Sequence, residues 1–100
     1  MIKHIVMWKL KDIAEGADAS ANAVKMKEML ERLRGRIPGL VNIEVGIEMV
    51  ESVPECDVVL YSEVETREAL EAYQIHPEHQ ECVAFIKKVV SERRVVDYEI

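Results

Sequence analysis

The sequence has few cysteines and glycines, and each scarcity excludes a class of site. It holds only two cysteines, Cys56 and Cys82, which is too few for the disulfide framework of a small secreted domain. We therefore expect both thiols to be free and Cys82 to be a small core residue. The four glycines are scattered along the chain, so it has no glycine-rich loop of the kind that binds phosphate.

Long apolar runs and an excess of positive charge are also absent. No run approaches the roughly 18 apolar residues of a membrane-spanning helix, and the first nine residues are too charged for a signal peptide. We therefore expect a cytoplasmic protein. The formal net charge of −6 would repel a phosphate backbone, so we do not expect nucleic acid as a partner. Without a long apolar run we do not expect a membrane as a partner either. With 49% apolar residues, residues 1–100 can form a single domain with a real core.

Four segments show the patterns of β-strands. Residues 2–10 alternate, with Ile2, His4, Val6, Trp8 and Leu10 on one face, and apolar residues on both faces predict a strand covered on both sides. Residues 40–48 alternate with one polar face, which is typical of a strand near an edge. Residues 57–64 contain β-branched residues and read as a strand. The connection from the previous strand is short, so the two strands should run antiparallel. The last strand is predicted at 94–99.

Two further regions have helical periodicity. Residues 11–19 are predicted to be a loop and Ser20 the N-cap of a helix that ends at Gly35. Thr66 is predicted to cap a helix that runs to about Gln74, and Pro77 to open another helical piece. The inner side of the first helix should carry Ala23, Met26, Leu30 and Leu33.

The resulting order, β-α-β-β-α-β, predicts an α+β fold in which helices cover one face of a four-stranded antiparallel sheet. The other face would then be bare. An exposed apolar face of that size is typical of a partner surface, and the simplest partner is a second copy of the chain. The sequence therefore predicts a homodimer packed sheet to sheet, through Ile5, Met7, Val59, Tyr61 and Val96 or Tyr98.

Three polar side chains are predicted to meet between the helices and the sheet. His4 lies on the same strand face as Val6, while Tyr73 and His79 lie on the inner stripes of their helices. A histidine can exchange a proton near neutral pH, and a tyrosine hydroxyl can orient a substrate oxygen. The cluster indicates proton transfer on a small, mostly apolar carbonyl or phenolic compound.

Other interpretations of these residues stay open. Buried His and Tyr side chains are often structural groups with satisfied hydrogen bonds. His76, before a proline, is most simply a helix-boundary residue. His76, Glu78 and His79 with the distant His4 could bind a metal, but no known metal-ligand spacing is present, and we expect no metal or cofactor. Cys82, one turn from His79, could be a nucleophile, although a core thiol is favoured.

Several segments together resemble a known family. They are residues 2–11, the Ile37-Pro38-Gly39-Leu40 turn leading to residues 44–46, the Tyr73–His79 segment and residues 95–98. They are similar to the Dabb family, the stress-responsive dimeric α/β-barrel domain, over essentially the whole chain. The resemblance implies a ferredoxin-like fold and a homodimer whose two sheets close into a barrel.

The resemblance also implies roles for the three clustered residues. The family includes plant stress proteins and olivetolic acid cyclase, which performs an aldol condensation with a His and a Tyr. By position His79 would be the catalytic acid or base, Tyr73 the catalytic tyrosine and His4 a pocket residue. Met26 and Leu30 stand where the cyclase has aromatic residues, so its activity is not carried over. The alternatives are a non-catalytic stress-related or ligand-binding dimer, and a haem- or metal-dependent monooxygenase like those among related dimeric barrels.

Overall fold

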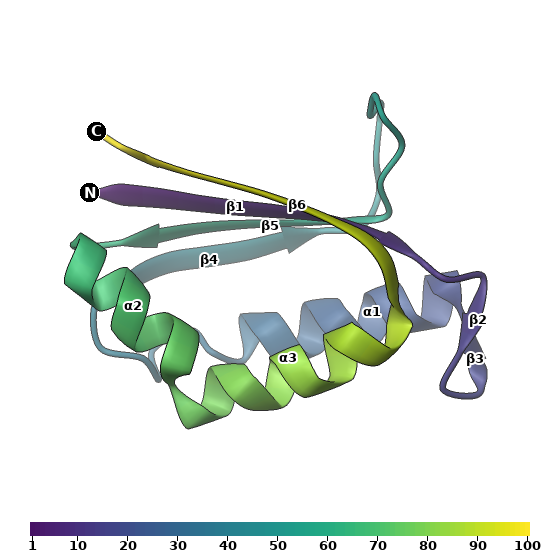
Figure 1. Cartoon of the computed structure of the whole chain (residues 1–100), viewed down its shortest axis with the longest axis horizontal. Coiled ribbons are helices and arrows are strands. Elements are labelled where there is room, and N and C mark those ends of the chain that lie inside the picture. Colours follow the sequence, from purple (N-terminus) through teal and green to yellow (C-terminus); the bar gives the residue numbers. More distant parts are fainter.

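The computed structural model describes residues 1–100 and shows helices covering one face of a single main sheet (Figure 1). The sheet has four antiparallel strands in the order β4-β5-β1-β6. This is the predicted α+β, ferredoxin-like architecture. None of the helices combines the length and apolar character that crossing a membrane requires. The elements are β1 (Ile2–Leu10), β2 (Ile13–Ala14), β3 (Ala17–Asp18), α1 (Ala19–Glu31), β4 (Leu40–Gly46), β5 (Val58–Val64), α2 (Arg67–Ile75), α3 (Pro77–Val89) and β6 (Val90–Glu99).

The central strand β1 has the alternation that the sequence predicts. Its odd-numbered and even-numbered side chains point to opposite faces of the sheet. The even-numbered ones, including His4, Val6 and Trp8, are buried under the helices. Ile5 and Met7 on the other face are only half-buried. Strand β4 lies at one edge of the sheet, as its polar face predicted.

The start of α1 differs from the prediction. The segment expected to be a loop contains a short hairpin, β2–β3, and Asn22 donates a side-chain hydrogen bond to the carbonyl of Ala14 within it (3.0 Å). The hairpin brings Asp18, not Ser20, to the N-cap, where its Oδ1 accepts from the backbone N–H of Ala21 (2.8 Å). The helix also ends earlier than predicted, at Glu31, and continues as turns to Gly35.

The second helical region follows the prediction closely. Thr66 caps α2 by accepting from the N–H of Ala69 (3.0 Å), and Pro77 opens α3 at a position that needs no N–H. The last strand begins at Val90 rather than Arg94. The reason is that α3 runs directly into β6, where a register shift leaves Ser91 of β6 unmatched and lets Leu10 pair with Val90.

The core lies between the sheet and the helices and contains Cys82, as predicted. On the outer edge of β4, Glu31 accepts from the N–H of Val45 (3.0 Å), and Lys27 donates to the Val45 carbonyl. These side chains of α1 occupy backbone groups that would otherwise be free to pair with another strand.

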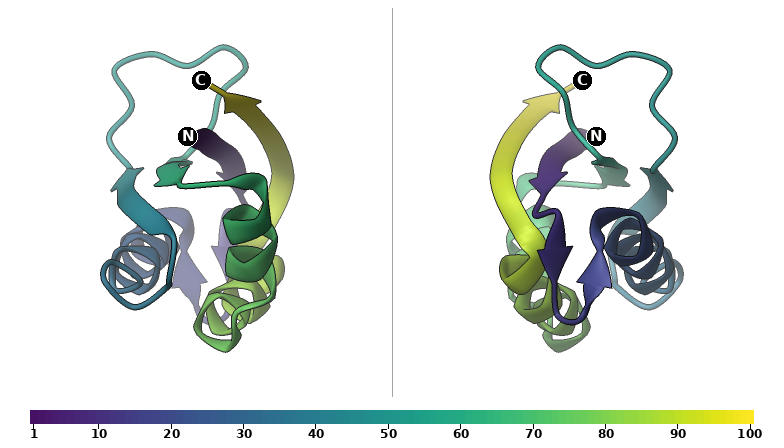
Figure 2. Two further views of the ribbon diagram at one scale, coloured as in Figure 1. Left: turned by 90° about the vertical axis from the view of Figure 1, so that its left-hand side faces the viewer. Right: turned by 90° about the vertical axis from the view of Figure 1, so that its right-hand side faces the viewer.

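The face of the sheet away from the helices carries no element of secondary structure. The loop between β4 and β5 projects from this side (Figures 1 and 2). Val96 and Tyr98 are 47% and 44% exposed there, so this chain alone leaves an apolar surface in contact with water.

Candidate functional site

His4 is held on the covered face of the sheet by two neighbouring strands. It is 3% exposed and stands opposite Asp97 of β6, whose Oδ1 hydrogen-bonds to the Nδ1 of His4. On the other side, Ser62 of β5 donates its hydroxyl to the backbone carbonyl of His4 (3.0 Å). A carboxylate on Nδ1 fixes the orientation of the ring and leaves Nε2 as the nitrogen available for chemistry.

Tyr73 and His79 come from the two helices that meet at His76, and they join His4 in one aromatic cluster. The Tyr73 and His79 ring centroids are 4.4 Å apart with a 39° tilt, and Tyr73 meets His4 edge-on at 6.0 Å. The structure therefore brings together the three residues that the sequence nominated, with the tyrosine between the histidines.

His79 is oriented by the end of α2. Its Nδ1 lies 3.1 Å from the backbone carbonyl oxygen of Gln74. Because that oxygen can only accept, Nδ1 carries the proton and Nε2 keeps a lone pair. Burial lowers the pKa of His79, and the charges of His4, Arg93 and His76 lower it further, against the raising effect of the Gln74 bond. A neutral imidazole with a free Nε2 can act as a base at neutral pH.

The Tyr73 hydroxyl is enclosed, whereas orienting a substrate oxygen would require it to be accessible. Its side chain is fully buried, and its hydroxyl has no hydrogen-bond partner. Burial, above all, raises its pKa, with a smaller contribution from Cys82. The phenol therefore stays protonated, as a donor with no acceptor in reach.

A cavity of about 380 Å³ adjoins the two histidines, a volume within the range of small-molecule sites. It lies between β1, β5 and α3, and its walls are mainly apolar. Tyr73 is not one of the residues that line the cavity. Its lining includes His4, His79, Trp8, Gln74, Gln80, Val83, Lys87 and Arg93.

Sequence reasoning missed Asp97, Gln74 and Arg93. The partner of His4 is 93 positions away in the chain, so only the strand register could reveal it. Aligning 2–10 antiparallel with the last strand would have placed an acidic residue opposite His4. Gln74 contributes a backbone carbonyl to His79, and a backbone group leaves no signal in the residue type.

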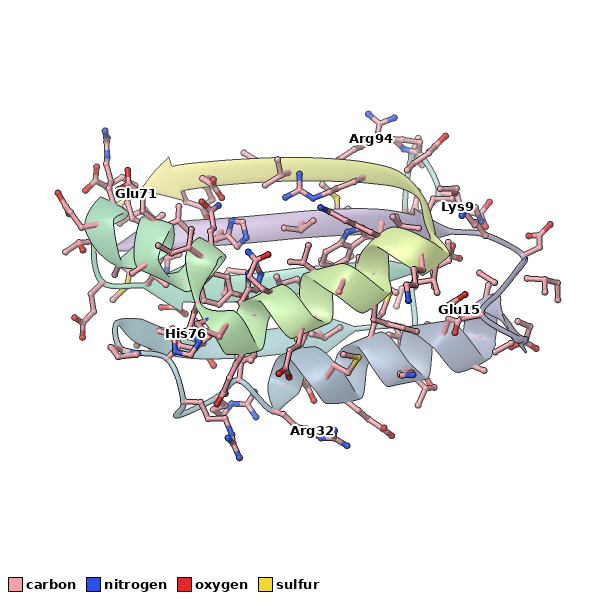
Figure 3. All side chains as sticks on the ribbon, turned by 60° about the horizontal axis from the view of Figure 1, so that its bottom comes forward. Lys9, Glu15, Arg32, Glu71, His76 and Arg94 are labelled. Atoms are coloured by element: carbon pink, nitrogen blue, oxygen red, sulfur yellow. The ribbon has the colours of Figure 1, made fainter.

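His76 and Cys82 do not join the site. His76 lies at the turn between α2 and α3 (Figure 3), where its Nδ1 accepts from the N–H of Glu78 (3.2 Å) as a helix cap. Burial raises the pKa of the Cys82 thiol, which keeps it in the poorly nucleophilic form. In residues 1–100, no three His, Cys, Asp or Glu side chains are grouped closely enough to bind a metal ion.

Comparison with known proteins gives a family and a fold. The model of the stress responsive A/B barrel domain matches residues 2–100. A dimeric protein of unknown function with a ferredoxin-like fold from Bacteroides fragilis is 31% identical, with a TM-score of 0.83 over 99% of this chain and 95% of that one. No curated protein matches the chain.

Two more distant structures share the fold and are named for enzyme activities. An antibiotic biosynthesis monooxygenase is 18% identical, with a TM-score of 0.73 over 100% of this chain and 98% of that one. A hydroxynitrile lyase from Passiflora edulis is 14% identical, with a TM-score of 0.78 over 99% and 92%. At these identities the likeness concerns the fold alone.

Proposed function

The chain belongs to the stress responsive A/B barrel domain family, and from that premise we propose that it binds a small hydrophobic carbonyl or phenolic compound and transforms it by acid–base chemistry. One observation carries the proposal. His79 is a neutral, hydrogen-bonded imidazole in the wall of an apolar cavity, beside the His4–Asp97 pair. Titratable groups with oriented tautomers in such a cavity are the usual elements of proton transfer.

Each residue has a separate part in this proposal. The Nε2 of His79 takes a proton from the carbon beside a carbonyl, or from a phenol, and returns it later. With a proton on each ring nitrogen, His4 would donate from Nε2 to the oxygen on which charge develops, while its Nδ1 donates to Asp97, which keeps the ring in place. Tyr73 packs against the His79 ring. Its assignment as an oxygen-orienting residue stays a prediction, because its hydroxyl is enclosed.

We also propose that the protein is a homodimer that joins the two bare sheet faces. The exposed apolar side chains on that face support this, as does the dimeric relative from Bacteroides fragilis. Burying Ile5, Met7, Val96 and Tyr98 against a second copy would remove them from water. A cytoplasmic location likewise stays a prediction.

Proton abstraction can be tested without the natural substrate. We choose 2-octanone, an apolar ketone, and follow exchange of its α-protons for deuterium in D₂O by NMR. The wild-type protein should accelerate exchange, and His79→Gln should lower the rate by about 10²-fold or more. His76→Gln, which changes a histidine outside the cavity, is the matched control. Equal exchange rates for wild type and His79→Gln would refute the role of His79.

A second candidate, a non-catalytic ligand-binding or structural dimer, is favoured by one observation. Tyr73 is completely buried between the two histidine rings, as in a packed core. This candidate predicts no acceleration of exchange by the wild type, together with a lower melting temperature for His79→Gln. The two measurements on one variant therefore separate the candidates.

A further inference from the structure

A second polar pair lies along the same two strands as the site. In the β1–β6 register, Trp8 stands opposite Arg93, four residue pairs along from His4 and Asp97. Residues directly opposite each other share a face of the sheet, so Trp8 and Arg93 both lie on the side of the helices. Both line the cavity, and Lys87 of α3 lines it as well.

These three side chains have hydrogen-bond donors that nothing in the chain accepts. Arg93 and Lys87 are exposed to solvent and form no ion pair or side-chain hydrogen bond, whereas the neighbouring Lys88 pairs with Glu15 (3.6 Å). The indole Nε1 of Trp8 is buried without an acceptor, in a side chain only 4% exposed. The Trp8 N–H is the one buried donor of the three, and buried donors without partners are rare in folded proteins.

The charge balance of the cavity is opposite to that of the whole chain. The protein has 19 acidic and 13 basic residues, yet the lining contains Lys87 and Arg93 and no Asp or Glu. The carboxylate of Asp97, which does not line the cavity, is hydrogen-bonded to His4. A bound molecule would therefore meet an apolar wall, two solvent-exposed cations without an acidic partner and the unpaired N–H of Trp8.

We propose that the ligand of this cavity is an amphiphilic carboxylate, whose anionic group is bound by Arg93 and Lys87 and accepts from the Nε1 of Trp8. The guanidinium suits a carboxylate because its planar donors can form two parallel bonds. The apolar part would lie along Val83 and the other aliphatic residues of the wall. The inference rests on the proposed function and narrows its substrate class to hydrophobic keto or phenolic acids.

Two probes with the same apolar chain, one with an anionic and one with a neutral head group, can test this. Octanoate and octanamide have the same apolar chain, and Trp8, the only tryptophan, reports binding by its fluorescence. We expect octanoate to bind at least tenfold more tightly than octanamide. Arg93→Gln and Lys87→Gln should each weaken octanoate binding about tenfold and leave octanamide binding unchanged. Trp8→Phe, followed by calorimetry, should weaken octanoate alone.

Two neighbouring cations provide matched controls. Arg94 points away from α3 (Figure 3) and Lys88 does not line the cavity, so Arg94→Gln and Lys88→Gln should bind octanoate like the wild type. Octanamide binding as tightly as octanoate, or equal losses in Arg93→Gln and Arg94→Gln, would overturn the carboxylate site and leave hydrophobic binding intact. Failure of both probes to bind would overturn the proposed function as well.

Discussion

His4 and Asp97 face each other across β1 and β6, and the Asp97 carboxylate hydrogen-bonds to the Nδ1 of a histidine that is almost completely buried. The two residues are almost at opposite ends of the chain. Pairing of the first strand with the last therefore brings the Asp97 carboxylate to the His4 ring and fixes the orientation of this candidate catalytic residue.

Removing the carboxylate should therefore destabilise the fold. In Asp97→Ala the buried Nδ1 of His4 has no partner, which costs about 1–3 kcal/mol. Asp97→Asn should lose less, because its amide oxygen can still accept. Urea denaturation measures the free energy of unfolding, with Glu92→Ala on the same strand as the control. If Asp97→Ala unfolds at the same urea concentration as the wild type, the hydrogen bond between Asp97 and His4 does not contribute to stability.

The stability of the protein should also depend on the protonation of His79. Its pKa is lowered in the folded state, mainly by burial, so the unfolded chain binds more protons at mildly acidic pH. The stabilisation is then complete above the ordinary pKa of about 6.5 and is lost as the pH falls through the folded pKa.

We expect urea midpoints to fall when the pH is lowered from 7.5 toward 5, and to fall less in His79→Gln. The NMR titration of His79 should give a pKa below that of a model histidine. An unchanged slope in His79→Gln would show that another group titrates. Deuterium exchange of 2-octanone should decline in the same acidic range, because the protonated ring cannot act as a base.

The sequence predicted the fold far better than the fine geometry of the site. Strand β1 has a clear alternation, and Thr66 and Pro77 are strong helix-start signals, so these elements were found. The β2–β3 hairpin was missed because strands of two residues have no period to detect. The N-cap at Asp18 was missed for the same reason, because its position depends on where the hairpin ends.

The same contrast holds inside the site. The meeting of His4, Tyr73 and His79 was predictable because each lies on the inner, apolar face of its strand or helix. Asp97 and Arg93 were not, because their roles follow from the register between the first and last strands, which pair across almost the whole chain. The enclosure of the Tyr73 hydroxyl depends on packing that no local pattern describes.

The bare sheet face makes a prediction about assembly. Val96 stands opposite Ile5 and is 47% exposed on that face, so Val96→Glu would place a charge in the proposed interface at a large desolvation cost. We expect the wild type to sediment as a dimer and Val96→Glu as a monomer. Val24→Glu, a similarly exposed valine of α1, should remain a dimer. A Val96→Glu dimer would locate the interface elsewhere.

The tyrosine at the centre of the cluster gives the sharpest test of what the cluster is for. In Tyr73→Phe the ring still packs between the two histidines, while a buried hydroxyl without a partner is removed. Stability should therefore be unchanged or slightly increased. Tyr73→Ala, which removes the ring as well, should cost about 3–5 kcal/mol.

Activity then separates two roles for Tyr73. If its ring only positions His79, Tyr73→Phe should exchange the α-protons of 2-octanone at the wild-type rate. If its hydroxyl contacts the substrate oxygen after the site opens, the exchange rate should fall although the fold is as stable as before. A marked loss of stability in Tyr73→Phe would instead mean that the hydroxyl has a partner in solution, such as a bound water.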